Sequence, residues 1–183
     1  MDPVPHAREP AGTEPPARRR HGGDGRGRRA SLVVRLLAVL AVAAYLFAAF
    51  LPVLLSRGYL DGPRIRYTTL GESGPSPSTD PVYVVLWLLV IAAAGTVCAL
   101  PRSRVCALVP LVVAGVLLVF WGSLVADPPR LMWDGQDADG EWIGGMEVGE
   151  PHVGAALVAA SVLLFAASGA RGLLAARTQV PHG

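Results

Sequence analysis

The sequence predicts an all-α membrane protein, a bundle of four transmembrane helices with a small β-rich extracytoplasmic cap formed by its two outer loops. Composition gives the first reason: of 183 residues, 52% are hydrophobic and only 16% are charged, which is unusual for a soluble domain. The second reason is clustering, because the apolar residues gather in four long stretches that contain a single charged residue, Arg35.

The predicted helices are 18 to 24 residues long and cover residues 32–55, 82–100, 105–126 and 153–170. At about 1.5 Å per residue they reach roughly 27 to 36 Å, which matches a hydrocarbon core of about 30 Å. The other segments are a tail at 1–31, outer loops at 56–81 and 127–152, a cytoplasmic link at 101–104 and a tail at 171–183. A secretory signal is the alternative for the first stretch, but its length favours a permanent helix.

The distribution of arginine predicts the orientation. With the N-terminus inside, twelve arginines lie on the cytoplasmic side and four lie outside, while ten of the fourteen acidic residues lie outside. Because arginine in short loops is retained on the cytoplasmic side, we expect a multi-pass protein of the plasma membrane with its N-terminus and C-terminus both in the cytoplasm.

Residues 1–31 are rich in proline, glycine and arginine, a composition that predicts a disordered cytoplasmic tail. The arginines at 18–20 and 26–29 carry charge that suits either nucleic acid or anionic lipid headgroups. We interpret them as a topology anchor, so the expected partner is the lipid bilayer and no nucleic acid is expected.

The outer loops contain patterns typical of β-structure. Arg64–Leu70 alternates β-prone residues after the turn signal Asp61-Gly62-Pro63, and Leu131–Trp133 and Glu141–Ile143 flank a turn-rich segment. A lone hairpin is marginally stable, so we expect the three strands to form one sheet. Tyr67, Trp133 and Trp142 are then the residues that pack inside the cap, and Arg64 and Arg66 pair with the acidic second loop.

Few groups in the sequence suggest metal or catalytic chemistry. Asp137, Asp139 and Gly140 match part of a calcium-binding loop, but the bidentate carboxylate that closes such a loop is missing. Asp137, Asp139 and Glu141 therefore stay weak candidates for a divalent metal. No histidine lies within a predicted helix, so a haem site is not expected. No cofactor and no catalytic residue set is predicted.

The last predicted helix has small residues at helical spacing. One row contains Ala155, Ala159, Val162, Ala166 and Gly169, and a second runs beside it at Ala156, Ala160, Leu163, Ala167 and Ala170. Small residues let two helix backbones approach closely in a membrane. We favour a contact within the bundle over a dimer interface, and the oligomeric state is not predicted.

Lysine is absent, and alanine, glycine, proline and arginine are abundant. In this usage the chain resembles small multi-pass membrane proteins of actinobacteria, with their high-G+C genomes; the resemblance is compositional and carries no residue roles. The sequence favours a noncatalytic accessory function, in which the protein recognises another membrane or extracytoplasmic protein through its outer loops. Two alternatives remain: a subunit of an oligomeric transporter or channel, and a membrane enzyme that uses outer-loop acids.

Overall fold

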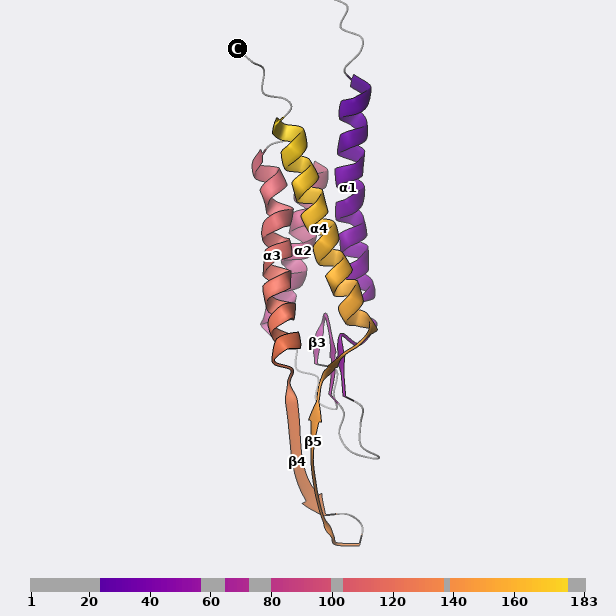
Figure 1. Ribbon diagram of the computed structural model, residues 1–183, viewed down its shortest axis with the longest axis vertical. Helices are drawn as coiled ribbons and strands as arrows, with labels where there is room; N and C mark the ends of the chain where they lie inside the picture. The colour runs from indigo at the N-terminus through magenta and orange to yellow at the C-terminus, as the bar shows by residue number, and fades with distance from the viewer. Residues whose placement is uncertain (1–23, 57–64, 73–79, 100–103, 137–138, 178–183) are drawn as a thin grey trace, which may run out of the picture.

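The computed structural model describes residues 24–56, 65–72, 80–99, 104–136 and 139–177. Within them the protein is mostly helical, with short strands at one end of the helices (Figure 1). The helices are α1 (Asp24–Phe47), α2 (Pro81–Ala99), α3 (Arg104–Ala126) and α4 (Val153–Arg177). The strands are β1 (Leu54–Leu55), β2 (Arg66–Thr68), β3 (Gly71–Glu72), β4 (Arg130–Gln136), β5 (Trp142–Val148) and β6 (Glu150–Pro151).

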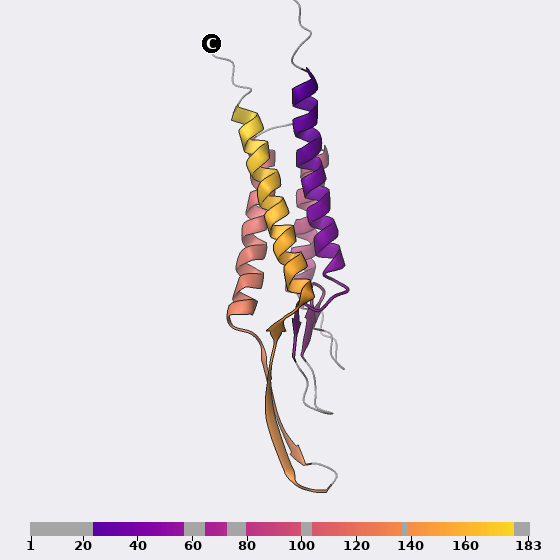
Figure 2. The same cartoon turned by 45° about the vertical axis from the view of Figure 1, so that its right-hand side comes forward.

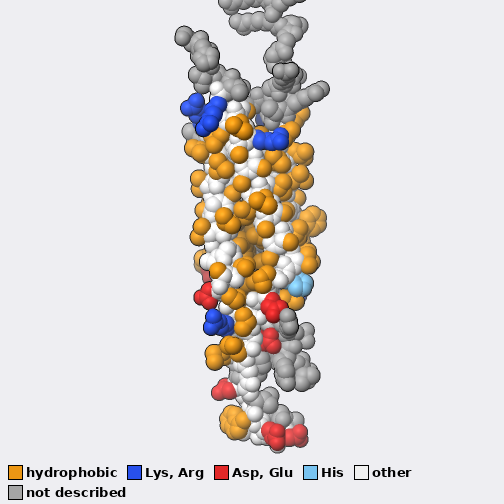
Figure 3. All heavy atoms as spheres, in the orientation of Figure 1, with side chains coloured by type: hydrophobic (Ala, Val, Ile, Leu, Met, Phe, Trp, Pro, Cys, Tyr) orange, Lys and Arg blue, Asp and Glu red, His pale blue; other side chains and the backbone are white. Residues whose placement is uncertain are grey.

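The helices run side by side along the long axis of the molecule (Figures 1 and 2). Helix α4 packs against both α1 and α3, and α2 packs against α1 and α3. Three helices are long and apolar enough to cross a membrane, namely α2, the Cys106–Ala126 part of α3, and α4. Their exposed outer faces are apolar (Figure 3), as expected where lipid replaces water as the solvent. The chain is therefore a membrane protein.

The first helix ends earlier than the sequence predicts. We expected it to continue to residue 55, whereas α1 ends at Phe47 and its apolar part is Ser31–Phe47. Pro52 explains the difference, because proline lacks a backbone N–H and disfavours the helical conformation of the residue before it. The last two residues of the predicted span, Leu54–Leu55, form β1 instead.

The start of α1 also differs from the prediction. Residues 24–31 were assigned to a disordered tail, but α1 begins at Asp24 and continues into the apolar stretch. Three of these residues are arginine, which has a good helix propensity and extends a helix that is already nucleated. The remainder of the predicted tail, residues 1–23, lies outside the described residues.

The strands do not form the single three-stranded cap that we expected. In the described part of the chain there are two sheets, one with the order β3-β2-β1-β6 and the other containing only β4 and β5. Strand β2 pairs antiparallel with β1 and β3, and β6 pairs with the other side of β1. The predicted loop-one strand thus takes its partner from the end of the predicted first helix, which leaves the β4–β5 hairpin separate.

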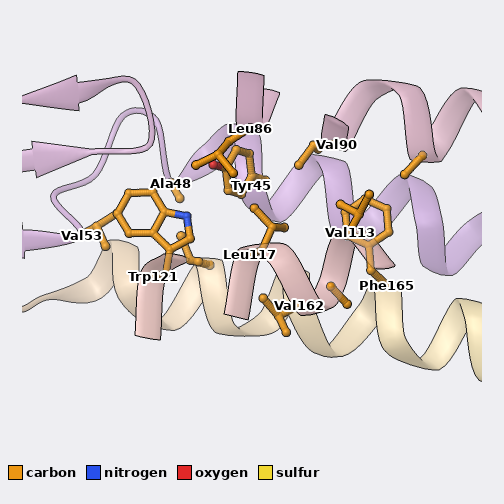
Figure 4. Close-up of a cluster of buried hydrophobic side chains, with 14 of the residues drawn as sticks. Tyr45, Ala48, Val53, Leu86, Val90, Val113, Leu117, Trp121, Val162 and Phe165 are labelled. Carbon is orange, nitrogen blue, oxygen red and sulfur yellow. The ribbon is translucent and has the colours of Figure 1, made fainter. Parts of the chain in front are cut away.

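The core lies between the helices and continues up to the sheets. Large side chains from all four helices are fully buried, among them Tyr45, Val90, Leu117 and Phe165 (Figure 4). Val53 and Leu54, which follow α1, belong to the same cluster. Helices and sheet therefore share one core.

The face of α4 that packs inside the bundle is shifted from the predicted one. Its buried residues are Gly154, Val158, Ser161, Val162, Phe165, Ser168 and Gly169. Val162 and Gly169 belong to the predicted row, whereas most of the second row is exposed. The contact within the bundle is present, and at Gly169 it is close enough that an added Cβ would lie 2.8 Å from the Ala107 carbonyl oxygen of α3.

Candidate interaction hairpin

The β4–β5 hairpin projects from the end of the helices, beyond the other strands (Figures 1 and 2). The two strands pair along their full length, from Arg130 opposite Val148 to Gln136 opposite Trp142. Gly140, in the turn, has a φ of 81°, a left-handed conformation that glycine adopts without strain. The hairpin predicted from the turn residues is therefore present and is longer than expected.

One face of the hairpin carries three exposed apolar side chains. Met132 and Met146 are directly opposite each other, and Trp142 lies on the same face because alternate residues of a strand share a face. Met132 and Trp142 are each 77% exposed and Met146 is 57% exposed. Apolar side chains gathered in this way on a projecting element are typical of a binding surface.

This exposure differs from the burial that we predicted for Trp142. The prediction assumed that a loop-one strand covers the hairpin, and in the described residues neither β4 nor β5 pairs with a third strand. Trp133 lies on the opposite face of β4 by the same alternation, and the position of its side chain is outside the description. Met132 and Met146 were not identified from the sequence as surface residues of the hairpin. Their positions on facing strands could have been inferred from the predicted hairpin.

Acidic residues lie close to these apolar side chains, and Asp134 is on the same face of β4 as Met132. Asp134, Asp139 and Glu141 are exposed on or near the hairpin, and Glu147 is buried near its base. Figure 3 shows acidic side chains along this part of the molecule. Arg130 forms an ion pair of 3.6 Å with Asp127 at the start of β4. The hairpin thus presents exposed apolar side chains together with acidic ones.

The weak metal candidates do not gain support from the structure. Asp137 is outside the described residues, and Asp139 and Glu141 lie in the turn region before β5. No group of three or more His, Cys, Asp or Glu side chains that could hold a metal ion occurs among the described residues.

The base of the hairpin is attached to the four-stranded sheet. The Gly149 amide donates to the Pro129 carbonyl oxygen at 3.1 Å, which closes the hairpin. Strand β6 follows directly and pairs with β1, with Leu54 opposite Pro151. The His152 amide then donates to the Val53 carbonyl oxygen at 2.9 Å. Backbone hydrogen bonds therefore connect the hairpin to the end of α1 and the start of α4.

The four-stranded sheet is in turn attached to the helices. The Trp87 indole N–H donates to the Thr69 carbonyl oxygen at 3.0 Å, and the buried Thr69 hydroxyl lies 3.5 Å from the Tyr45 carbonyl oxygen. The Ile65 amide donates to the buried Ser56 hydroxyl at 3.0 Å. These bonds hold the 65–72 segment against α1 and α2.

Tyr67 and Arg66 lie in this sheet and not beside the hairpin. Tyr67 packs partly buried against the core, and its hydroxyl is 3.4 Å from Glu72. Burial raises the pKa of Tyr67, and the Glu72 carboxylate adds to the increase. Arg66 is exposed and lies opposite Leu55, so its strand is paired with β1 and not with the acidic loop. Arg64 is outside the described residues.

Aromatic rings join the helices at this end. Tyr45 contacts Trp87 with ring centroids 4.9 Å apart, and Phe120 contacts Tyr83 at 5.6 Å and Trp121 at 5.3 Å. Tyr45 lies two residues before the end of α1. Such aromatic pairs contribute about 0.5–1.5 kcal/mol each beyond area burial, so the helices are well fixed directly beneath the sheets.

Comparison of the chain with protein-family models, with curated proteins and with solved structures finds no match.

Proposed function

We propose that this chain is a noncatalytic accessory protein of the plasma membrane that binds another protein through the β4–β5 hairpin. In this proposal all four helices span the bilayer, both termini are cytoplasmic and the sheets form an extracytoplasmic cap. The observation that carries the proposal is the exposed apolar face of Met132, Trp142 and Met146 on a projecting hairpin.

The charge distribution supports the orientation. Arg104 and Arg177 are exposed at the end of the bundle opposite the hairpin, whereas the exposed acids Asp134 and Glu141 are on the hairpin or beside it. Figure 3 shows basic side chains at the first end and acidic ones near the second. Because arginines stay on the cytoplasmic side during insertion, the hairpin is expected outside.

A fourth span is compatible with the length of α1. Its apolar part, Ser31–Phe47, reaches about 26 Å at 1.5 Å per residue, a few ångströms less than an average hydrocarbon core. Local thinning of the bilayer accommodates a mismatch of this size. Arg35 is exposed near the start of this segment, from where its side chain can extend to the interface.

The charge of the hairpin and the outer edges of its two strands indicate what kind of partner it can bind. Residues 127–152 contain one arginine and seven acidic residues, so a second copy of the same loop would be repelled. The partner expected is an extracytoplasmic protein with a basic and apolar surface. Methionine adapts its shape to a partner and tryptophan often contributes a large share of binding energy. In the described residues the outer edges of β4 and β5 are unpaired, so a partner segment can add to the hairpin as a strand.

Site-specific photo-crosslinking in native membranes tests this function. A photoreactive phenylalanine analogue at Met132 is expected to give a crosslinked protein that is lost when Trp142→Ala is added. A matched control is the same analogue at Leu70, which is 56% exposed in the turn between β2 and β3 and should not give that product. Crosslinks only to lipid, or equal products at both positions, would refute recognition through the hairpin.

A further inference from the structure

The end of the bundle opposite the hairpin is rich in exposed arginine. Arg35 of α1, Arg104 of α3, and Arg171 and Arg177 of α4 are all exposed there. Figure 3 shows basic side chains over the ends of these helices. Of the described acidic residues, Asp24 begins α1 at this end, and the others lie at the opposite end of the helices, on the strands or in the hairpin turn. Among the described residues, arginine therefore outnumbers acidic residues at this end of the bundle.

Two of these arginines lie at nearly the same level along the contact between α3 and α4. A Cβ added at Gly172 would be 2.9 Å from the Ala107 Cβ, so these two residues mark where the helices meet. Arg104 lies three residues before Ala107, and Arg177 lies five residues after Gly172. Since the helices are antiparallel, both arginines lie beyond the contact in the same direction, by about 4.5 and 7.5 Å. The two residues therefore differ in height along the helix axes by only about 3 Å, and most of the distance between them is the lateral separation of two packed helices, about 8–10 Å.

The helix surface next to these arginines is apolar. Leu108 and Val112 follow Arg104 by one and two helical turns, so they share its face of α3, and they are 48% and 63% exposed. Leu174 lies one turn before Arg177 on α4 and is 60% exposed. The two arginines, Arg104 and Arg177, are therefore next to an exposed apolar surface. This arrangement suits a molecule with an anionic headgroup and hydrocarbon chains.

We propose that Arg104 and Arg177 bind the phosphate group of an anionic phospholipid whose acyl chains lie along Leu108, Val112 and Leu174. Arginine presents several N–H donors in a planar fork that matches phosphate oxygens. Basic groups between transmembrane helices attract anionic headgroups where the helices leave the hydrocarbon. This site is independent of the hairpin and of the function proposed for it, because it depends only on α3 and α4.

Native mass spectrometry of the full chain in detergent tests the site, with added phosphatidylglycerol or phosphatidylcholine as the probe. Wild type should bind phosphatidylglycerol more tightly than phosphatidylcholine. The variant with both Arg104→Gln and Arg177→Gln should bind phosphatidylglycerol about 30-fold more weakly, since one basic residue corresponds to about a five-fold change in affinity. Arg130→Gln, which removes an arginine at the other end, is the matched control and should bind as wild type does.

A second variant guards against misfolding. Replacing both arginines with lysine preserves the charge and should retain more phosphatidylglycerol binding than the glutamine pair. Inorganic phosphate at millimolar concentration should not displace the lipid, because it lacks acyl chains. Equal binding of the two lipids, unchanged binding by the glutamine pair, or the same loss in Arg130→Gln would overturn the proposal. Displacement by inorganic phosphate would show a plain phosphate site and overturn the assignment to a lipid.

Discussion

Replacement of Gly154 by alanine tests how closely the start of α4 approaches the segment that follows α1. A Cβ added at Gly154 would lie 2.6 Å from the Pro52 carbonyl oxygen, 2.7 Å from its carbon and 2.8 Å from the Leu51 carbonyl oxygen. All three are backbone atoms, so no side chain can rotate away. The Gly154 amide also donates to the Pro52 oxygen at 2.9 Å, and the added methyl group would push these two backbones apart.

We expect Gly154→Ala to lower the free energy of unfolding by about 1–3 kcal/mol, the usual cost of overpacking a well-packed site. Gly115→Ala is the matched control, because an added Cβ there has no atom within 4 Å. In that helix interior alanine should raise stability by about 0.5–1 kcal/mol through its better helix propensity. The same chemical change is thus predicted to have opposite signs at two positions.

Denaturant unfolding of the purified variants in detergent measures this difference, and hydrogen exchange locates it. The amides of His152 and Gly154, which donate to Val53 and Pro52, should exchange faster in Gly154→Ala than in wild type, while α3 is unaffected. If Gly154→Ala unfolds at the same denaturant concentration as wild type and keeps its protection, the close approach between α4 and the Leu51–Pro52 segment is not a feature of the folded protein.

Gly169→Ala should destabilise by about 1–3 kcal/mol, because its Cβ would lie 2.8 Å from a backbone oxygen of α3; denaturant unfolding beside Gly115→Ala checks it. Ser168→Ala should cost about 0.5–1.5 kcal/mol in the same assay, since its hydroxyl donates to a carbonyl oxygen of α1 at 3.0 Å. The raised pKa of Tyr67 stabilises the folded state below about pH 10, the ordinary tyrosine pKa, and this stability is lost as the pH rises through the raised value. An alkaline unfolding titration should therefore show a smaller loss in Tyr67→Phe than in wild type. Trp142→Ala should change unfolding by less than about 0.5 kcal/mol, as is usual for exposed positions, and a loss of several kcal/mol would show that the indole is packed.

Hydropathy alone predicts where most of the helical structure lies, because a long apolar stretch in lipid has few alternatives to a helix. Helices α2 and α3 begin and end within one residue of the predicted stretches. The end of α1 is predictable too, since Pro52 lies inside the apolar stretch and proline interrupts a helix. An apolar run shows that residues are buried or face lipid, and it does not show which of them are helical.

The short strands could not be predicted in the same way. Strands β1 and β6 contain two residues each, Leu54–Leu55 and Glu150–Pro151, which is too short for any periodicity. Their pairing exists because the ends of α1 and α4 meet, and that contact joins residues about a hundred positions apart in the chain. The burial predicted for Trp142 was wrong for the same reason. It required the loop-one strand to pair with the hairpin, whereas that strand pairs with β1 and β3.

These same short strands connect the hairpin to the helices. Strand β4 follows α3 through Asp127 and the two prolines after it, and β5 leads through Gly149 and β6 into α4. Because β6 is also paired with β1, the base of the hairpin is connected to α3 through residues 127–129, to α4 through β6, and to α1 through β6 and β1. A partner that binds the hairpin would therefore act on α1, α3 and α4 together. Gly154 lies where two of these connections meet, so its substitution by alanine should weaken both the bundle and the placement of the hairpin.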